Sequence, residues 1–219
     1  MSDFNGLILV LGATGETGKL VVKSLQAKHI PVRILVRDED KASEFQSSGI
    51  EIIAGDPLNS HTEQRALSGV KAVIGVLGTR SANDLDEIEA VENQAIANLI
   101  QAVKAARVEH IVLCSSMGTT TPNQIPFLAH VLRGKRRGEI ALIESGIPYT
   151  IVHPGGLRND DGGQGVLSKD ALQGFGTITR ADVAEVLVQA LLQPEARNRS
   201  ADIIHNPEQG PANREGLFR

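Results

Sequence analysis

The sequence predicts an α/β protein with a doubly wound parallel sheet. Short apolar runs of strand length alternate with helix-like stretches almost to the end of the chain, and the first run leads into a glycine-spaced turn. Strands that alternate with helices pair in parallel through right-handed crossovers. The length of 219 residues suits one domain, residues 1–219, with a small C-terminal extension.

The predicted strands are apolar runs that end at glycine, proline or polar residues. Such runs, bounded by turn-forming residues, are typical of strands. We expect strands at residues 7–11, 32–36, 50–54, 72–77, 111–114, 149–152 and 201–205.

The predicted helices occupy residues 19–28, 87–106, 127–145 and 181–193. The second of them is the best defined, because apolar residues recur along it every three or four positions. Gly146 ends the third helix, Thr179 is a candidate N-cap of the fourth, and Pro194 stops the fourth.

The glycine-spaced turn follows the first strand and opens the first helix, which is the arrangement of a dinucleotide phosphate site. Its spacing is G-x-x-G-x-x-G. Gly12 permits the tight turn, Gly15 leaves room for a pyrophosphate, and Gly18 lets the helix pack close to the sheet. A pyrophosphate would lie at the positive helix N-terminus, so the fold is predicted to be of the Rossmann type. The alternative is a glycine-rich turn without a ligand.

The end of the second strand indicates which dinucleotide binds. Sites for NAD carry an acidic residue about 20 positions after the glycines, on the ribose 2′-hydroxyl. Here Val36 holds that position, Arg37 follows it, and Asp38 comes later in the turn. A guanidinium binds a 2′-phosphate that a carboxylate would repel, so the pattern favours NADP(H). An exposed loop arginine is the alternative for Arg37, and Lys41 either adds charge nearby or lies on a solvated helix face.

Net charge, cysteine content and apolar runs indicate which partners and which cellular compartment to expect. The net charge of −4 gives no electrostatic footprint for nucleic acid. The single cysteine, Cys114, excludes an intrachain disulfide and suits a reducing environment. The chain has no apolar run of membrane-spanning length and no histidine or cysteine spacing typical of a metal site. We expect a cytoplasmic protein, a monomer or weak homodimer, whose partner is a small-molecule substrate rather than nucleic acid or a membrane.

Ligands of parallel sheets bind beyond the carboxyl ends of the strands. The residues that follow the predicted strands are therefore expected to line one crevice, and they include Gly12, Arg37, Asp56, Gly78, Ser116 and Pro154. Residues 158–165, rich in aspartate and glycine, form a loop where a substrate lid would lie.

Five segments together resemble a known family. They are Gly-Ala-Thr-Gly-Glu-Thr-Gly (12–18), Leu-Val-Arg-Asp (35–38), Gly-Asp-Pro-Leu (55–58), His-Ile-Val-Leu-Cys-Ser-Ser (110–116) and Tyr-Thr-Ile-Val-His-Pro-Gly-Gly-Leu (149–157). In this order they resemble the atypical short-chain dehydrogenases/reductases of the NAD(P)-binding NmrA-like group, over the chain to about residue 205. Residues 76–80 and the chain length are similar to the biliverdin IXβ reductase/flavin reductase branch.

The resemblance implies a role for individual residues. Ser116 matches the active-site serine of the family, and Lys135 the lysine that holds the nicotinamide ribose, so both are candidate catalytic residues. Arg37 would hold the 2′-phosphate. The remaining cofactor contacts implied are Gly12, Thr14, Gly15, Glu16, Thr17 and Gly18 at the pyrophosphate, Asp56 and Leu58 by the adenine, and Gly78, Thr79, Arg80, Ser115, Pro154, Gly155, Gly156 and Leu157 towards the nicotinamide.

The chain departs from the family at the usual proton donor. Standard members use Tyr-x-x-x-Lys, whose lysine lowers the pKa of the tyrosine, but Val131 stands four residues before Lys135. The only tyrosine, Tyr149, lies in a predicted buried strand. The biliverdin IXβ branch carries a histidine where Gly156 stands, and the nearby His153 is a candidate in its place.

These features predict an NADP-dependent oxidoreductase that transfers a hydride to a conjugated acceptor. Flavins, quinones and linear tetrapyrroles accept a hydride with solvent as the proton source, whereas simple ketones need an acid. The alternative is a non-catalytic NADP(H)-binding redox sensor that acts through a protein partner. A sugar-nucleotide epimerase or dehydratase fits less well, because those enzymes need the tyrosine.

Overall fold

A central eight-stranded sheet organises the computed structural model, which describes residues 6–46, 49–208 and 216–218. The strand order is β3-β2-β1-β4-β5-β6-β10-β8. The bounds are β1 Leu7–Leu11, β2 Val32–Val36, β3 Glu51–Ala54, β4 Val70–Gly75, β5 His110–Cys114, β6 Tyr149–Pro154, β8 Val166–Lys169 and β10 Arg199–His205. The predicted strands are all confirmed, and their ends differ from the predicted ones by at most two residues.

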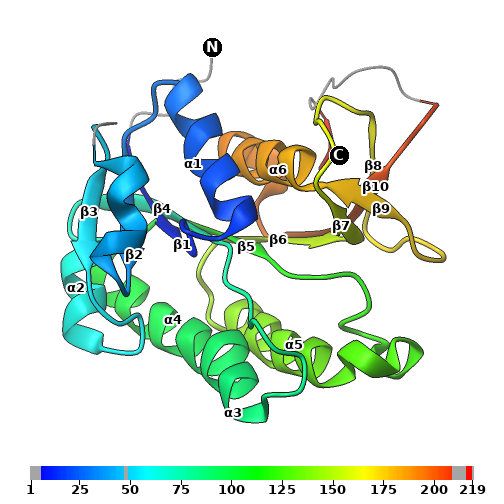
Figure 1. The fold of residues 1–219 in the computed structure, drawn as a ribbon, viewed down its shortest axis with the longest axis horizontal. Coiled ribbons are helices and arrows are strands. Elements are labelled where there is room, and N and C mark those ends of the chain that lie inside the picture. The colour runs from blue at the N-terminus through cyan, green and yellow to red at the C-terminus, as the bar shows by residue number, and fades with distance from the viewer. Residues whose placement is uncertain (1–5, 47–48, 209–215, 219) are drawn as a thin grey trace.

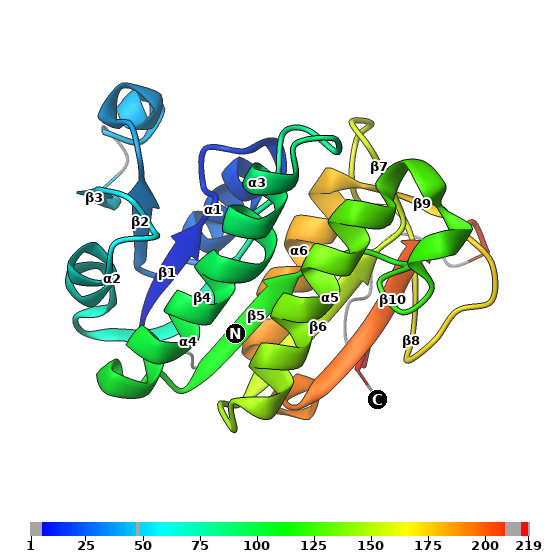
Figure 2. The ribbon, with the colours of Figure 1, turned by 90° about the horizontal axis from the view of Figure 1, so that it is seen from below.

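Helices cover both faces of the sheet (Figure 1). One face carries α1 (Glu16–Ala27) and α6 (Arg180–Leu192), and the other carries α2 (Ser60–Leu67), α4 (Ala95–Ala106) and α5 (Ala129–Glu144). Figure 2 shows α4 and α5 side by side across the second face. The predicted doubly wound Rossmann-type architecture is confirmed.

Two apolar cores result, because alternate side chains of each strand point to opposite faces. In β1, Ile8 and Val10 pack into the core under α1 and α6. Leu9 and Leu11 pack into the core that α2, α4 and α5 cover. All four side chains are buried, so β1 is at the centre of the molecule.

The predicted strands pair in parallel, and an edge strand that the sequence does not predict, β8, adds an antiparallel pair. β8 pairs antiparallel with β10, whereas all the other described pairs of this sheet are parallel. A second small parallel sheet joins β7 (Gly156–Arg158) to β9 (Thr177–Thr179). These short strands carry no alternating apolar pattern, and their pairing depends on a close approach: a Cβ at Gly155 would lie 2.3 Å from the carbonyl oxygen of Gly176.

The loop predicted at residues 158–165 begins after β7, and it is anchored at both ends. The Arg180 guanidinium donates to Asn159 (2.8 Å), and the Gly163 N–H donates to Asp182 (2.8 Å). Asp182 also lies in the first turn of α6, where Thr179 is the N-cap as predicted and accepts from the Asp182 N–H (3.0 Å). The loop is therefore tied to the start of α6.

The long helix predicted at 87–106 is continuous, but one segment of it is a π-helix with wider turns. It begins as α3 (Leu85–Ile88), continues as a π-helical segment (Glu89–Gln94), and becomes α4. The apolar stripe predicted the helix but could not predict the widened turn, because a π turn forms around tertiary contacts.

Candidate functional site

The three glycines of the turn between β1 and α1 differ in what an added side chain would contact. A Cβ at Gly12, where φ is +79°, would lie 2.3 Å from the Val76 carbonyl oxygen, and one at Gly18 would lie 2.1 Å from the Gly12 oxygen. Both glycines are needed for packing alone. A Cβ at Gly15 would meet only the Gly12 oxygen, at 3.3 Å, so Gly15 faces open space in the cavity described below.

The N-terminus of α1 begins at this turn and is available to an anion. Gly15 is its N-cap, and no side chain of the described residues caps it. The Gly15 N–H donates to the Gly12 oxygen (3.0 Å), which fixes the turn. N–H groups at a helix N-terminus and the helix dipole bind phosphate. A glycine that leaves the space in front of them open therefore fits the diphosphate of a dinucleotide.

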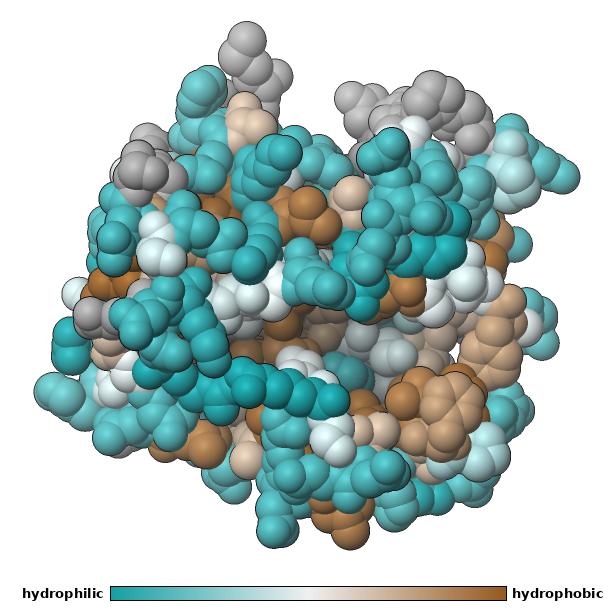
Figure 3. All heavy atoms as spheres, in the orientation of Figure 1, coloured by the Kyte–Doolittle hydropathy of each residue, from teal (hydrophilic) through white to brown (hydrophobic). Residues whose placement is uncertain are grey.

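A cavity of about 510 Å³ extends from this turn along the carboxyl ends of β1, β2 and β4. Figure 3 shows the surface hollowed in the middle of this face, between the α1 side and the α3 side. Eight predicted cofactor residues line the cavity: Gly12, Thr14, Gly15, Arg37, Asp56, Leu58, Gly78 and Arg80. The predicted crevice at the carboxyl ends thus brings together residues from four separate parts of the chain.

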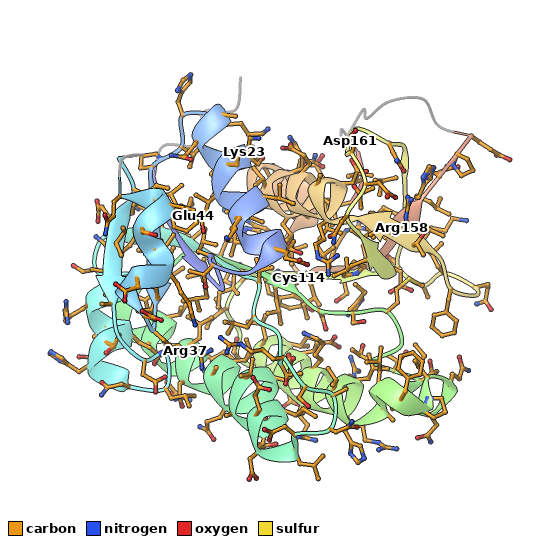
Figure 4. The ribbon with its side chains drawn as sticks, in the orientation of Figure 1. Lys23, Arg37, Glu44, Cys114, Arg158 and Asp161 are labelled. Atoms are coloured by element: carbon orange, nitrogen blue, oxygen red, sulfur yellow. The ribbon has the colours of Figure 1, made fainter. Side chains whose placement is uncertain are left out.

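The end of this cavity beside β2 carries two basic side chains. Arg37 and Lys41 both line it, and Arg37 follows β2 directly (Figure 4). One oxygen of the Asp38 carboxylate accepts from the Asp40 N–H (3.1 Å) and caps the short helix that follows, and the other lies 3.7 Å from the Lys41 ammonium. Asp56 accepts from the Leu58 N–H (2.9 Å), which shapes the loop after β3. Arg37 therefore suits a 2′-phosphate, whereas the charge of Lys41 is shared with Asp38.

Two carboxylates, those of Glu87 and Glu92, accept hydrogen bonds from the loop after β4. Glu87 accepts from the Thr79 hydroxyl (3.0 Å) and from the Arg80 N–H (3.2 Å). Glu92 accepts from the Thr79 N–H (2.8 Å) and from the Lys135 ammonium (2.8 Å). Lys135 also lies 3.4 Å from the Leu77 oxygen. The motifs predict Thr79, Arg80 and Lys135 as site residues but miss both glutamates.

A buried network lies beyond the ends of β5 and β6. Glu139 is fully buried, and its carboxylate accepts from the Ser115 hydroxyl, the Thr119 hydroxyl (3.2 Å) and the Arg136 guanidinium (3.0 Å). It also lies 3.0 Å from Nε2 of His153. Burial alone would raise the pKa of Glu139, but the His153 hydrogen bond and charge, with Ser115 and Arg136, hold that pKa below its usual value.

His153 bridges two carboxylates. Its Nδ1 lies 3.3 Å from Asp202, on β10, and its Nε2 lies 3.0 Å from Glu139. Burial lowers the pKa of His153, but the hydrogen bonds that its ring donates to Asp202 and Glu139 outweigh burial and raise the pKa to about 9. Both ring nitrogens of His153 lie against carboxylates, and the buried side chain does not line the 510 Å³ cavity, so its candidate role as proton donor stays a prediction.

The other predicted residues lie at the same edge of the sheet but outside the lining of the 510 Å³ cavity. Ser116 donates to the Met117 oxygen (3.2 Å), and Pro154 ends β6. Gly155 makes the close approach already described. The remaining four are Glu16, exposed and paired with Arg180 (2.9 Å); Thr17, buried in α1; and Gly156 and Leu157, exposed in β7.

The cysteine and the tyrosine contribute no proton donor. Burial raises the pKa of the Cys114 thiol to about 11, and the nearby Lys135 lowers it only in part. Tyr149 is half-buried at the start of β6, at the opposite end of that strand from Pro154. Val131 is buried in α5, where the family has its tyrosine.

Two features are absent from the part of the chain that the structure describes. None of their helices combines the length and apolar character needed to cross a bilayer. Within the same residues, no group of three or more histidine, cysteine, aspartate and glutamate side chains is arranged to hold a metal ion.

Comparison with known proteins points to one family. A family model described as NAD(P)H-binding matches residues 12–194. A sanguinarine reductase from Eschscholzia californica is 33% identical, over 92% of this chain and 89% of its own. An NAD(P)H azoreductase from Xenophilus azovorans is 32% identical, over 89% of this chain and 66% of its own. The solved structure of an anaerobillin reductase from Escherichia coli O157:H7 has the same fold, with a TM-score of 0.79 at 22% identity, and the match covers 94% of this chain and 100% of that one.

Proposed function

Since the chain belongs to the NAD(P)H-binding family, we propose that it is an NADPH-dependent reductase of a conjugated small-molecule acceptor. Two relatives above 30% identity are named as reductases, which supports an oxidoreductase. The single observation that carries the choice of NADPH is Arg37, which lines the cavity at the end of β2, where a site for NAD would carry a carboxylate.

Each half of the cofactor has its own set of residues in this proposal. The N-terminus of α1 and Gly15 hold the diphosphate, and Arg37 holds the 2′-phosphate. Lys135, fixed by Glu92, holds the nicotinamide ribose. When bound, the nicotinamide supplies the hydride, and the protein supplies orientation and exclusion of water.

The acceptor class follows from the acids and apolar groups near the carboxyl ends. Ser115 donates to Glu139, His153 lies between two carboxylates, and no tyrosine stands in the family position. An acceptor that needs an enzymic acid is therefore disfavoured, and solvent protonates the product. Phe127 and Phe175 are 74% and 57% exposed, on the loops after β5 and β8, and they offer flat apolar surface to a conjugated ring system.

The test is NADPH oxidation under anaerobic conditions with a panel of flavins, quinones, linear tetrapyrroles and azo compounds. We expect turnover with at least one of these and none with simple ketones. Phe175→Ser should raise the KM for the acceptor several-fold and leave the affinity for NADPH unchanged, with Lys23→Ser as a surface control on α1. Turnover of simple ketones alone would contradict the proposed acceptor class.

A second candidate is a non-catalytic redox sensor that binds NADP(H). The observation in its favour is that the hydroxyl and acid groups near the carboxyl ends of β5 and β6 are bonded to one another. Tight NADPH binding without turnover of any acceptor in the panel would favour the sensor over the reductase.

A further inference from the structure

Glu92 is a buried carboxylate that joins the cofactor cavity to α5. Its side chain is 3% exposed, and it lies in the π-helical segment Glu89–Gln94. One carboxylate oxygen accepts from the Thr79 N–H (2.8 Å), and the other accepts from the Lys135 ammonium (2.8 Å). A buried charge needs such compensation, and here both oxygens are used.

Two glycines on α5 allow this contact. A Cβ at Gly138 would lie 2.6 Å from the backbone oxygen of Glu92, and one at Gly134 would lie 3.1 Å from its Cβ. The π turn adds a residue to the facing helix at the same place. The widened turn and the two glycines together bring the Glu92 carboxylate within reach of Lys135, which lies between them in the sequence.

The groups that Glu92 holds belong to one end of the site. Lys135 lines a small cavity with Leu77, Cys114 and Ser115, at the carboxyl ends of β4 and β5. Thr79 follows Gly78, which lines the cofactor cavity. Arg37 and Asp56 lie at the adenosine end, on elements that Glu92 does not bond.

We propose that Glu92 is a positioning residue for the nicotinamide half of the cofactor, acting through the Lys135 ammonium and the Thr79 amide. The inference rests on the proposed function, since it takes the 510 Å³ cavity as the NADPH site. It predicts that loss of the carboxylate weakens the binding of whole NADPH and spares ligands that end at the adenosine.

The experiment is calorimetric titration of Glu92→Gln with two ligands, NADPH and adenosine 2′,5′-bisphosphate. A glutamine keeps the shape, but it has one acceptor oxygen and turns its amide donor towards either Thr79 or Lys135. We expect NADPH to bind about 10-fold more weakly, the order expected for a lost hydrogen bond to a charged group. Adenosine 2′,5′-bisphosphate should bind within about twofold of the unmutated protein, which also reports an intact fold.

The matched control is Glu89→Gln. Glu89 lies in the same π segment and pairs with Arg137 of α5 at 2.5 Å, but both side chains are about half exposed. The same substitution there changes an ion pair between the same two elements without touching the loop after β4. Both ligands should bind Glu89→Gln as they bind the unmutated protein.

A double variant, Glu92→Gln with Lys135→Met, tests whether Glu92 acts through Lys135. If Glu92 acts by fixing the ammonium, Glu92→Gln should add no more than about a further twofold loss to Lys135→Met, as expected of residues in one network. If Glu92→Gln fails to fold, Glu92→Asp replaces it, and the loss should again be confined to NADPH.

Three results would overturn the inference. They are unchanged NADPH binding by Glu92→Gln, equal weakening of both ligands, and full additivity with Lys135→Met. Failure of the unmutated protein to bind either ligand would instead overturn the proposed function, and the inference with it.

Discussion

At the scale of single residues, the proposed function assigns Arg37 and Gly15 to the two ends of one ligand. Arg37 stands where NAD-specific sites carry a carboxylate, and Gly15 is the glycine of the turn whose missing side chain leaves the cavity open. Each makes a separate prediction.

Arg37→Ala should weaken NADPH binding by at least about 10-fold and leave NADH binding nearly unchanged, because a charge-assisted pair contributes roughly 1.5–3 kcal/mol. Calorimetry with both cofactors measures the difference. Lys23→Ala removes an exposed positive charge of α1 (Figure 4) that does not line the cavity, and it should change neither affinity. Equal affinities of the unmutated protein for NADPH and NADH would refute the assignment.

Gly15→Val should abolish the binding of both cofactors while the chain still folds. The new Cβ would meet only the Gly12 oxygen, at 3.3 Å, so the remaining atoms point into the space of the diphosphate. Circular dichroism checks the fold and calorimetry checks the binding. Binding that survives this substitution would mean that the phosphate site lies elsewhere.

The sequence could predict these two residues because their proposed roles depend on local spacing. A glycine turn after a strand, and an arginine at the end of the next strand, carry their meaning in the spacing. Glu92 and Glu139 belong to no motif of fixed spacing, because Lys135 and His153, their partners, lie far from them in the sequence and meet them only in the folded chain. One signal was present: Glu92 lies four residues after Ile88, on the apolar stripe of the helix, where a charge demands a buried partner.

At the scale of elements, α5 meets the π-helical segment across Gly134 and Gly138, against the ordinary preference of helices. Glycine in a helix interior costs about 1 kcal/mol relative to alanine, so propensity alone predicts that alanine at both positions stabilises the protein. The contacts predict the reverse.

Gly138→Ala should lower the free energy of unfolding by about 1–2 kcal/mol, because overpacking against the backbone exceeds the gain in propensity. Gly134→Ala should cost less, since its new Cβ would meet side-chain atoms of Ile88 (2.9 Å) and Glu92 (3.1 Å) that can shift. Urea unfolding of the two variants and the unmutated protein shows which substitution lowers the free energy of unfolding more. A Gly138→Ala protein more stable than the unmutated chain would contradict the close packing.

The charged network of α5, β6 and β10 makes stability depend on pH in a stated direction. The pKa of His153 is about 9 in the folded protein, above its ordinary 6.5, so its contribution is complete below about pH 6.5 and is lost as the pH rises through 9. The lowered pKa of Glu139 stabilises the fold above the ordinary glutamate value and is lost in acid.

His153→Gln should therefore lower the free energy of unfolding by roughly 3 kcal/mol at pH 6.5 and by much less at pH 10. Urea unfolding of both proteins at the two pH values measures the change. A difference between the proteins that stays constant with pH would show that His153 is neutral in the folded state.

At the scale of the whole molecule, seven strands of the central sheet could be predicted from the sequence because each is a distinct apolar run, whereas α2 (Ser60–Leu67) was not predicted. The comparisons confirm the resemblance to NAD(P)-binding proteins that the motifs indicated. The edge of the sheet could not be read in the same way. β8, β7 and β9 are three or four residues long, and their pairing is set by contacts such as that of Gly155 with Gly176.

Cofactor binding should stabilise the whole fold, since the cavity joins β1, β2, β4 and the long helix. A ligand at 100 times its Kd adds about 2.7 kcal/mol to the free energy of unfolding. For a chain of this size the melting temperature should rise by roughly 5–10 °C. Thermal denaturation with NADPH and with NADH at equal concentrations gives a larger rise for NADPH, whereas equal rises would contradict the choice of NADPH.

The two outer strands bear on how copies of this chain behave at high concentration. An exposed strand edge invites another chain to add to the sheet. β3 and β8 are each only four residues long, and β3 begins at Glu51, whose charge pairs with Arg33. Beside β8, the Ser168 hydroxyl donates to the Leu217 oxygen (2.7 Å), and Phe218 is buried. Short, charged or occupied edges disfavour the growth of one sheet into the next, so removal of the last residues should promote aggregation.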